Sequence, residues 1–102
     1  MQTTIKSYTA FNYESITVSS TAVGLTSSKF ADYAAYEIKA FITAEGGDMR
    51  WRIDGTAPTA TEGHLLTANQ NLTLEGYKNL ANFKAIRTGT SDGTIRVTYM
   101  VA

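Results

Sequence analysis

The chain of 102 residues has no cysteine, one proline, one histidine and no excess of charge, because nine basic residues balance nine acidic ones. Without cysteine there are no disulfides, thiol nucleophiles or thiolate metal ligands. The balanced charge argues against a basic nucleic-acid-binding domain. No apolar run approaches bilayer-spanning length, and the start of the chain lacks a secretory signal. We therefore expect a small soluble domain, made in the cytoplasm, that binds neither nucleic acid nor membrane.

The chain does contain stretches in which apolar residues alternate with other residues. The alternation is clearest over residues 94–101, and it recurs over residues 36–44 and 49–54. Such a period of two is typical of half-buried strands. Between the second and third stretches lies Glu-Gly-Gly-Asp at 45–48, and paired glycines suit a tight hairpin loop. We therefore predict an antiparallel hairpin over residues 36–54.

Weaker patterns complete the predicted secondary structure. Further strands are expected at residues 16–18, 72–74 and 83–87, with another candidate at 5–8. Residues 54–58 and 88–93 carry the Gly, Pro, Asp and Ser composition of connecting loops. Helix is limited to two short candidate turns, at 28–34 with Ser27 or Ser28 as its cap and at 77–82.

These elements predict an all-β fold, an antiparallel β-sandwich with at most short helical turns. A jelly roll and an immunoglobulin-like domain are the two candidate topologies. The expected core takes the inward positions of the alternating stretches: Ile16, Val18, Tyr36, Ile38, Ile42, Trp51, Ile53, Leu72, Leu74, Phe83, Ile95, Val97 and Tyr99.

The residues offer little for catalysis. His64 is the only histidine, and no serine lies in a nucleophile motif, so we expect His64 to have a structural or loop role. The carboxylate pairs Glu45 with Asp48 and Asp54 with Glu62 flank predicted loops, where acidic residues are common. The usual metal-ligand and phosphate-binding spacings are absent. We predict a protein that is not an enzyme and has no catalytic residues, cofactor or metal.

The aromatic residues raise the alternative of sugar binding, since flat rings stack on sugar faces. Trp51 shares its predicted strand face with Met49 and Ile53, however, which favours burial. Arg50 and Arg52 project from the opposite face, where pairing with nearby carboxylates is the favoured interpretation.

The N-terminal stretch differs in character from the rest of the chain. It mixes Ile5, Tyr8, Phe11 and Tyr13 with polar residues and has no firm turn signal. Residues 1–13 are therefore either an edge strand of the domain formed by residues 14–102 or an arm that adds to a neighbouring subunit. We expect these four apolar residues to contact another subunit or a coat protein, and a chain without residues 1–13 to remain folded.

Four segments, residues 16–26, 49–60, 62–65 and 83–99, resemble small structural proteins encoded by tailed bacteriophages and prophages. The resemblance implies a non-enzymatic virion protein with a β-sandwich fold, of the capsid decoration or cement type, located on the capsid surface. Its implied partners are the phage major capsid protein and further copies of itself in a homo-oligomer, for which we expect a trimer. A tail, neck or fibre location is the alternative.

A second resemblance is confined to Arg52–Thr59, with the sequence Arg-Ile-Asp-Gly-Thr-Ala-Pro-Thr. It is similar to the strand and loop of immunoglobulin-like domains appended to chitobiases and other surface glycosidases. This resemblance implies an accessory or carbohydrate-binding module as the alternative function, and it predicts a sandwich in either case.

Overall fold

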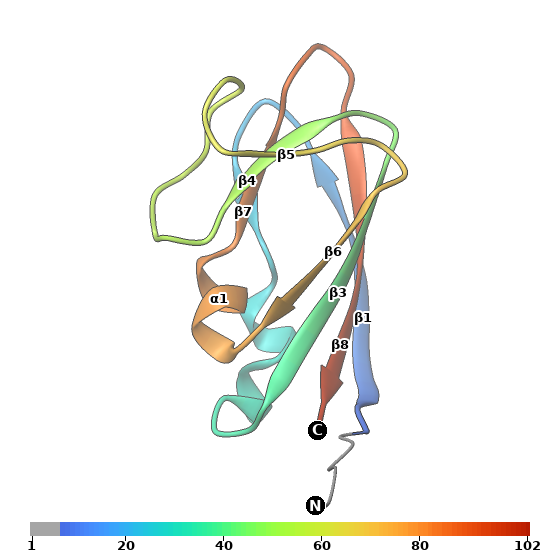
Figure 1. Cartoon of the computed structure of the whole chain (residues 1–102), viewed down its shortest axis with the longest axis vertical. Helices are drawn as coiled ribbons and strands as arrows, with labels where there is room; N and C mark the ends of the chain where they lie inside the picture. The colour runs from blue at the N-terminus through green and yellow to red at the C-terminus, as the bar shows by residue number, and fades with distance from the viewer. Residues whose placement is uncertain (1–6) are drawn as a thin grey trace, which may run out of the picture.

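Two four-stranded antiparallel sheets pack face to face in the computed structural model, which describes residues 7–102 (Figure 1). The first sheet has the order β1-β8-β3-β6 and the second the order β2-β7-β4-β5. The all-β sandwich predicted from the sequence is therefore confirmed. In chain order the strands are β1 (Thr9–Val18), β2 (Val23–Gly24), β3 (Ile38–Glu45), β4 (Met49–Arg52), β5 (His64–Leu66), β6 (Asn71–Glu75), β7 (Lys84–Arg87) and β8 (Gly93–Val101).

The strand pairs are nested along the chain. β1 pairs with β8, β2 with β7, β3 with β6 and β4 with β5, as in a long hairpin whose middle is β4 and β5. Rolling this hairpin brings β3 against β8 and β4 against β7. The result is the strand arrangement of a jelly roll. An immunoglobulin domain instead keeps its first two strands in one sheet, whereas here β1 and β2 lie in different sheets.

The core fills the space between the sheets with the inward side chains of the longest strands. In β3 and β8 buried and less buried residues alternate, as expected for strands that have one face on the core. Tyr99 is fully buried, and its ring stacks on that of Phe30 with 5.4 Å between the ring centroids. Phe30 also meets Tyr77 edge to face, so three aromatic rings close one end of the core.

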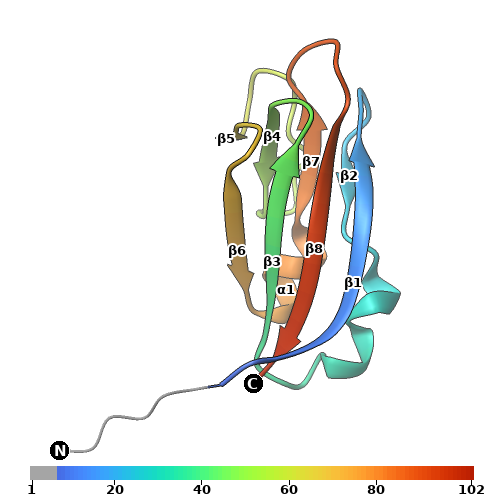
Figure 2. The ribbon, with the colours of Figure 1, turned by 90° about the vertical axis from the view of Figure 1, so that its right-hand side faces the viewer.

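The predicted hairpin over residues 36–54 is wrong in its pairing. Both of its strands form, but β3 belongs to the first sheet and β4 to the second. The loop at 45–48, in which Gly46 has φ +89°, turns the chain from one sheet to the other (Figure 2). Alternation fixes which face of a strand is buried but not its partner, and Ile42 of β3 and Met49 of β4 enter the same core from opposite sheets.

The helical content is as small as predicted. The helix α1 (Tyr77–Asn82) confirms one candidate, and its Leu80 is buried. The other candidate forms two 3₁₀ turns, η1 (Ser27–Lys29) and η2 (Ala31–Tyr33). The expected serine cap is wrong, because Thr26 occupies the cap position of η1 and makes no side-chain capping hydrogen bond.

Most of the predicted core is buried, but five positions differ. Tyr36 was expected inside and is 61% exposed, because it precedes β3 in a turn rather than extending the strand. The other four are only half-buried: Ile16 and Leu72 on edge strands, Trp51 near the end of β4, and Ile53 just beyond it.

Candidate functional site

Of the N-terminal residues that the sequence singled out, Phe11 and Tyr13 lie on the edge strand β1, and Tyr8 directly precedes it. Ile5 falls outside the described residues. From Thr9 to Val18 the chain is paired with β8, interrupted only by a one-residue bulge at Phe11, so no break separates residues 9–13 from the rest of the strand. Among the two interpretations of this segment, an edge strand therefore describes residues 9–13.

Phe11 is directed into its own subunit. As the extra residue of the bulge, it packs on Tyr33 with a centroid distance of 4.1 Å and lies 6.2 Å from Tyr99. Its ring thereby extends the buried aromatic cluster. These contacts stabilise the start of β1, and the predicted contact of Phe11 with another subunit or a coat protein stays a prediction.

Tyr8 takes part in a polar cluster at the end of the first sheet. Its hydroxyl donates to Glu37 Oε2 at 3.0 Å, and Lys39 Nζ lies 4.1 Å from the centre of its ring. Lys39 is in turn 3.3 Å from Glu75 Oε1. A cation above a tyrosine face and an ion pair beside it hold the ring in place.

Tyr13 stands on the outer face of the first sheet and is 51% exposed. Its hydroxyl lies 3.2 Å from Ser15 Oγ and accepts a hydrogen bond from Arg96 Nη1 at 3.4 Å. The hydrogen bond with Ser15, followed by that from Arg96, lowers the pKa of Tyr13. Arg96 also donates from Nε to Glu45 Oε1 at 2.9 Å. The exposed ring is thus held by a polar network anchored on β3 and β8.

Phe41 joins Tyr13 on this face and was missed by the sequence analysis. It is 38% exposed, and the register places Tyr13, Thr98 and Phe41 in one row across β1, β8 and β3. The signal was present, because Phe41 occupies an outward position of an alternating stretch. Phe41 thus leaves part of a large apolar side chain exposed on the outer face of the sheet. We call Tyr13, Thr98 and Phe41 the aromatic row.

Comparison of the chain with protein-family models, curated proteins and solved structures finds no match. The site is therefore interpreted from its own geometry. Within residues 7–102, no three or more His, Asp or Glu residues gather closely enough to hold a metal ion. Over the same range, the helices are too short and too polar to cross a bilayer.

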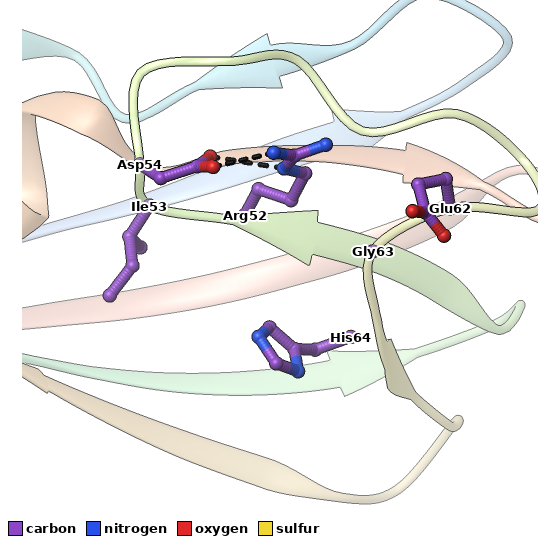
Figure 3. A pocket seen from close by; sticks show the side chains of 6 residues that line it. All are labelled: Arg52, Ile53, Asp54, Glu62, Gly63 and His64. Carbon is purple, nitrogen blue, oxygen red and sulfur yellow. Dashed lines mark hydrogen bonds and ion pairs between the residues drawn. The ribbon is translucent and has the colours of Figure 1, made fainter.

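A second candidate is the loop between β4 and β5, which forms an open cleft of about 380 Å³. In Figure 3, Arg52 and Asp54 lie side by side, and Glu62 approaches from the far arm of the loop. The residues that line it are Arg52, Ile53, Asp54, Glu62, Gly63 and His64.

The cleft contains the carboxylate pair Asp54 and Glu62, but Asp54 is unsuited to act as a general acid. Arg52 Nε donates to Asp54 Oδ1 at 3.0 Å, and this hydrogen bonding lowers the pKa of Asp54 to about 2. Glycoside hydrolysis requires one carboxyl that stays protonated near neutral pH. At neutral pH Asp54 is therefore a charge partner for Arg52, as the sequence analysis predicted for this arginine.

His64 and Arg50 hold the two ends of this loop. The imidazole of His64 lies 4.8 Å from the ring of Trp51, its register partner on β4. Arg50 Nη1 donates to the Gly63 carbonyl at 3.1 Å, so its expected carboxylate partner is replaced by a backbone oxygen. The first contact joins β4 to β5, and the second joins β4 to the end of the loop just before β5.

Proposed function

We propose that this protein is a non-enzymatic component of a tailed-phage virion, a capsid decoration or cement protein that binds the major capsid protein and forms a homo-oligomer, with a trimer as the expected state. The resemblance of four sequence segments to phage structural proteins supports the virion location. The jelly-roll fold is compatible with it, because viral capsid domains use this architecture. The geometry adds a surface suited to assembly.

The observation that carries the proposal is the edge of β1 that has no strand partner. At ten residues it is the longest strand, and within residues 7–102 it pairs on one side only, with β8. Sheet edges are normally protected by lysine, proline or short strand length, because unpaired backbone groups recruit other strands. β1 contains neither lysine nor proline.

The one charge on β1 is already engaged. Both oxygens of the Glu14 carboxylate accept hydrogen bonds from Thr26, from Oγ1 at 2.7 Å and from the backbone N–H at 3.1 Å. Glu14 is therefore held within the subunit, so it protects the edge less than a solvated side chain does. A strand from a second molecule can pair with this edge through its backbone, with little dependence on charge.

The aromatic row adjoins this edge and gives the contact its apolar part. Tyrosine and phenylalanine contribute large contact areas at low entropic cost when they are held in place, and the network around Arg96 holds Tyr13. On a repetitive shell, several such contacts acting together bind more strongly than one. Edge and row together form one continuous candidate interface.

Virion composition tests the location directly. Mass spectrometry of purified virions is expected to find this chain in a fixed copy number that scales with the coat protein. A copy number of only a few would favour the tail, neck or fibre. Absence from virions would refute the proposal.

A pair of lysine variants tests the edge. Thr17 is exposed on β1, so Thr17→Lys should weaken oligomer formation and capsid attachment by placing an edge-protecting charge on the interface. Thr90→Lys adds the same charge in the exposed loop between β7 and β8 and should leave both unchanged. Light scattering and decoration of empty capsids measure the effect, and equal behaviour of the two variants would refute the edge as the interface.

A further inference from the structure

A groove of about 500 Å³ runs along the side of the sandwich where β5 ends one sheet and β6 ends the other. No strand closes this side within the described part of the chain. Every residue that lines the groove is uncharged, and together they supply apolar surface and three amides: Trp51, Leu65, Leu66, Asn69, Gln70, Asn71 and Leu72. This composition distinguishes the groove from the charged cleft of Figure 3.

Trp51 supplies a fixed aromatic surface. It is half-buried, with His64 4.8 Å away on β5 and Phe83 stacked at 6.2 Å between centroids. These contacts set the orientation of the indole, and its remaining exposed part lines the groove beside Leu65, which is 49% exposed. The alternation favoured burial of Trp51 over sugar stacking, and its partial exposure strengthens the alternative of sugar binding.

The turn between β5 and β6 supplies amides in a defined place. Asn69 adopts a left-handed backbone with φ +74°, and its N–H donates to the Ala44 carbonyl at 2.7 Å, which ties the turn to β3. Gln70 Oε1 accepts from the Thr67 N–H at 2.9 Å, which leaves its NH₂ group to donate elsewhere. The side-chain amide of Asn69 makes no hydrogen bond to any described residue.

We propose that this groove binds a neutral saccharide. A sugar ring presents apolar C–H faces and a rim of hydroxyls that both donate and accept hydrogen bonds. Aromatic and aliphatic side chains match the faces, and amides match the rim because each carries a donor and an acceptor. An anionic sugar or a phosphate would find no cation among the lining residues. This binding activity is independent of capsid decoration and goes beyond it.

The test begins with an array of neutral and acidic oligosaccharides probed with the full-length chain. A neutral ligand found in this way is then titrated by calorimetry. Because Trp51 is the only tryptophan, its fluorescence should change in a saturable way with the same affinity. Asn69→Gly removes the amide but tolerates the left-handed backbone, and it should weaken binding about tenfold. Trp51→Phe should weaken binding at least as much.

The control is Glu62→Gln, which changes the neighbouring charged cleft and should bind like the parent. Circular dichroism and thermal unfolding establish that each variant is folded. If Trp51→Phe does not fold, the affinity of Asn69→Gly for the oligosaccharide tests the proposal. The proposal is overturned if no neutral oligosaccharide binds, if only acidic ones bind, or if Asn69→Gly binds as tightly as the parent.

Discussion

The hydroxyl of Tyr99 donates a hydrogen bond to the carboxylate of Glu14, and so links the centre of the first sheet to its edge. Tyr99 is fully buried on β8, and Glu14 also accepts two hydrogen bonds from Thr26. A single carboxylate thereby joins β8, β1 and the segment that leads into η1. Removing the donor is the direct way to measure what this junction contributes.

Tyr99→Phe should lower the free energy of unfolding by about 1–2 kcal/mol, because Glu14 loses one donor and keeps two. The pH dependence gives a sharper signature. Burial, and then the hydrogen bond to Glu14, raise the pKa of Tyr99. Above pH 10 the unfolded tyrosine loses its proton while the folded one keeps it, so stability falls as pH rises.

Denaturant titrations between pH 8 and pH 11 measure this effect. The parent should lose stability more steeply above pH 10 than Tyr99→Phe, with a difference in slope approaching about 1.4 kcal/mol per pH unit. Parallel curves for the two proteins would show that Tyr99 titrates as an ordinary exposed tyrosine.

Asp54 should titrate at about pH 2, because hydrogen bonding from Arg52 lowers its pKa. The lowered pKa means that the charged carboxylate favours folding above pH 3.8, and that this contribution is lost as pH falls from 3.8 towards 2. NMR titration of the side-chain carboxyl carbon measures the pKa. In Arg52→Gln it should rise towards 3.8, and an unchanged value would mean that the ion pair does not form in solution.

Gly63 combines a left-handed backbone with close neighbours on its side-chain side. Its φ is +135°, and an added Cβ would lie 3.1 Å from the Trp51 carbonyl oxygen and 3.1 Å from Pro58 Cβ. Gly55 also has positive φ, +90°, but open space around it. Gly63→Ala should therefore destabilise by about 1–3 kcal/mol and Gly55→Ala by less.

Gly89→Ala completes this series, because Gly89 has neither positive φ nor a neighbour within 4 Å of an added Cβ. Thermal unfolding should rank Gly63→Ala as the least stable of the three variants and Gly89→Ala as closest to the parent. An equal loss for Gly55→Ala and Gly63→Ala would show that backbone strain alone, without the steric contact, sets the cost.

Phe30→Ala should cost about 3–5 kcal/mol, since it empties the place between Tyr99 and Tyr77 in the core. Tyr36→Ala is the matched control and should cost less than about 1 kcal/mol, because Tyr36 is 61% exposed and contacts the edge of Tyr33. Chemical denaturation measures both. A similar cost for the two would contradict the placement of Phe30 in the core.

Phe30 and Tyr36 also show where inference from the sequence failed, whereas β3 and β8 show where it succeeded. Alternation identified the buried faces of β3 and β8, because a period of two leaves one set of residues on the core. Phe30 lies in a turn with no period, so nothing local marked it as buried. Tyr36 continues the alternation but lies two residues before β3 begins, and strand ends are poorly defined by such a pattern.

The pairing of strands and the candidate surfaces depend on contacts distant in sequence. The two glycines of the loop, Gly46 and Gly47, are compatible both with a hairpin and with a connection between the sheets. The loop connects the sheets because β3 pairs with β8 in one sheet and β4 pairs with β7 in the other. Phe41 was recognisable from its outward position, whereas the groove at Trp51 was not. The groove arises because β5 is the edge strand of the second sheet, and no sequence pattern predicted this strand of three residues.

Two truncations separate the fold from the proposed interface. Removing residues 1–7 leaves β1 and Phe11 intact, so the chain should keep its thermal stability within a few degrees. Removing residues 1–13 takes away half of β1 and the contact between Phe11 and Tyr33. The original expectation that this shorter chain stays folded is therefore replaced by an expected large loss of stability. Circular dichroism on heating compares both truncations with the parent.

The same truncations locate the contacts made by the N-terminal residues. If Ile5 contributes to subunit or coat contacts, removal of residues 1–7 should weaken oligomer formation and capsid attachment while the fold persists. Light scattering and capsid binding measure this, with Tyr13→Ala in the full-length chain as the comparison, since Tyr13 lies in the aromatic row. Loss of attachment in Tyr13→Ala alone would confine the interface to β1 and its outer face. Attachment equal to that of the parent in both variants would remove Ile5 and Tyr13 from the interface.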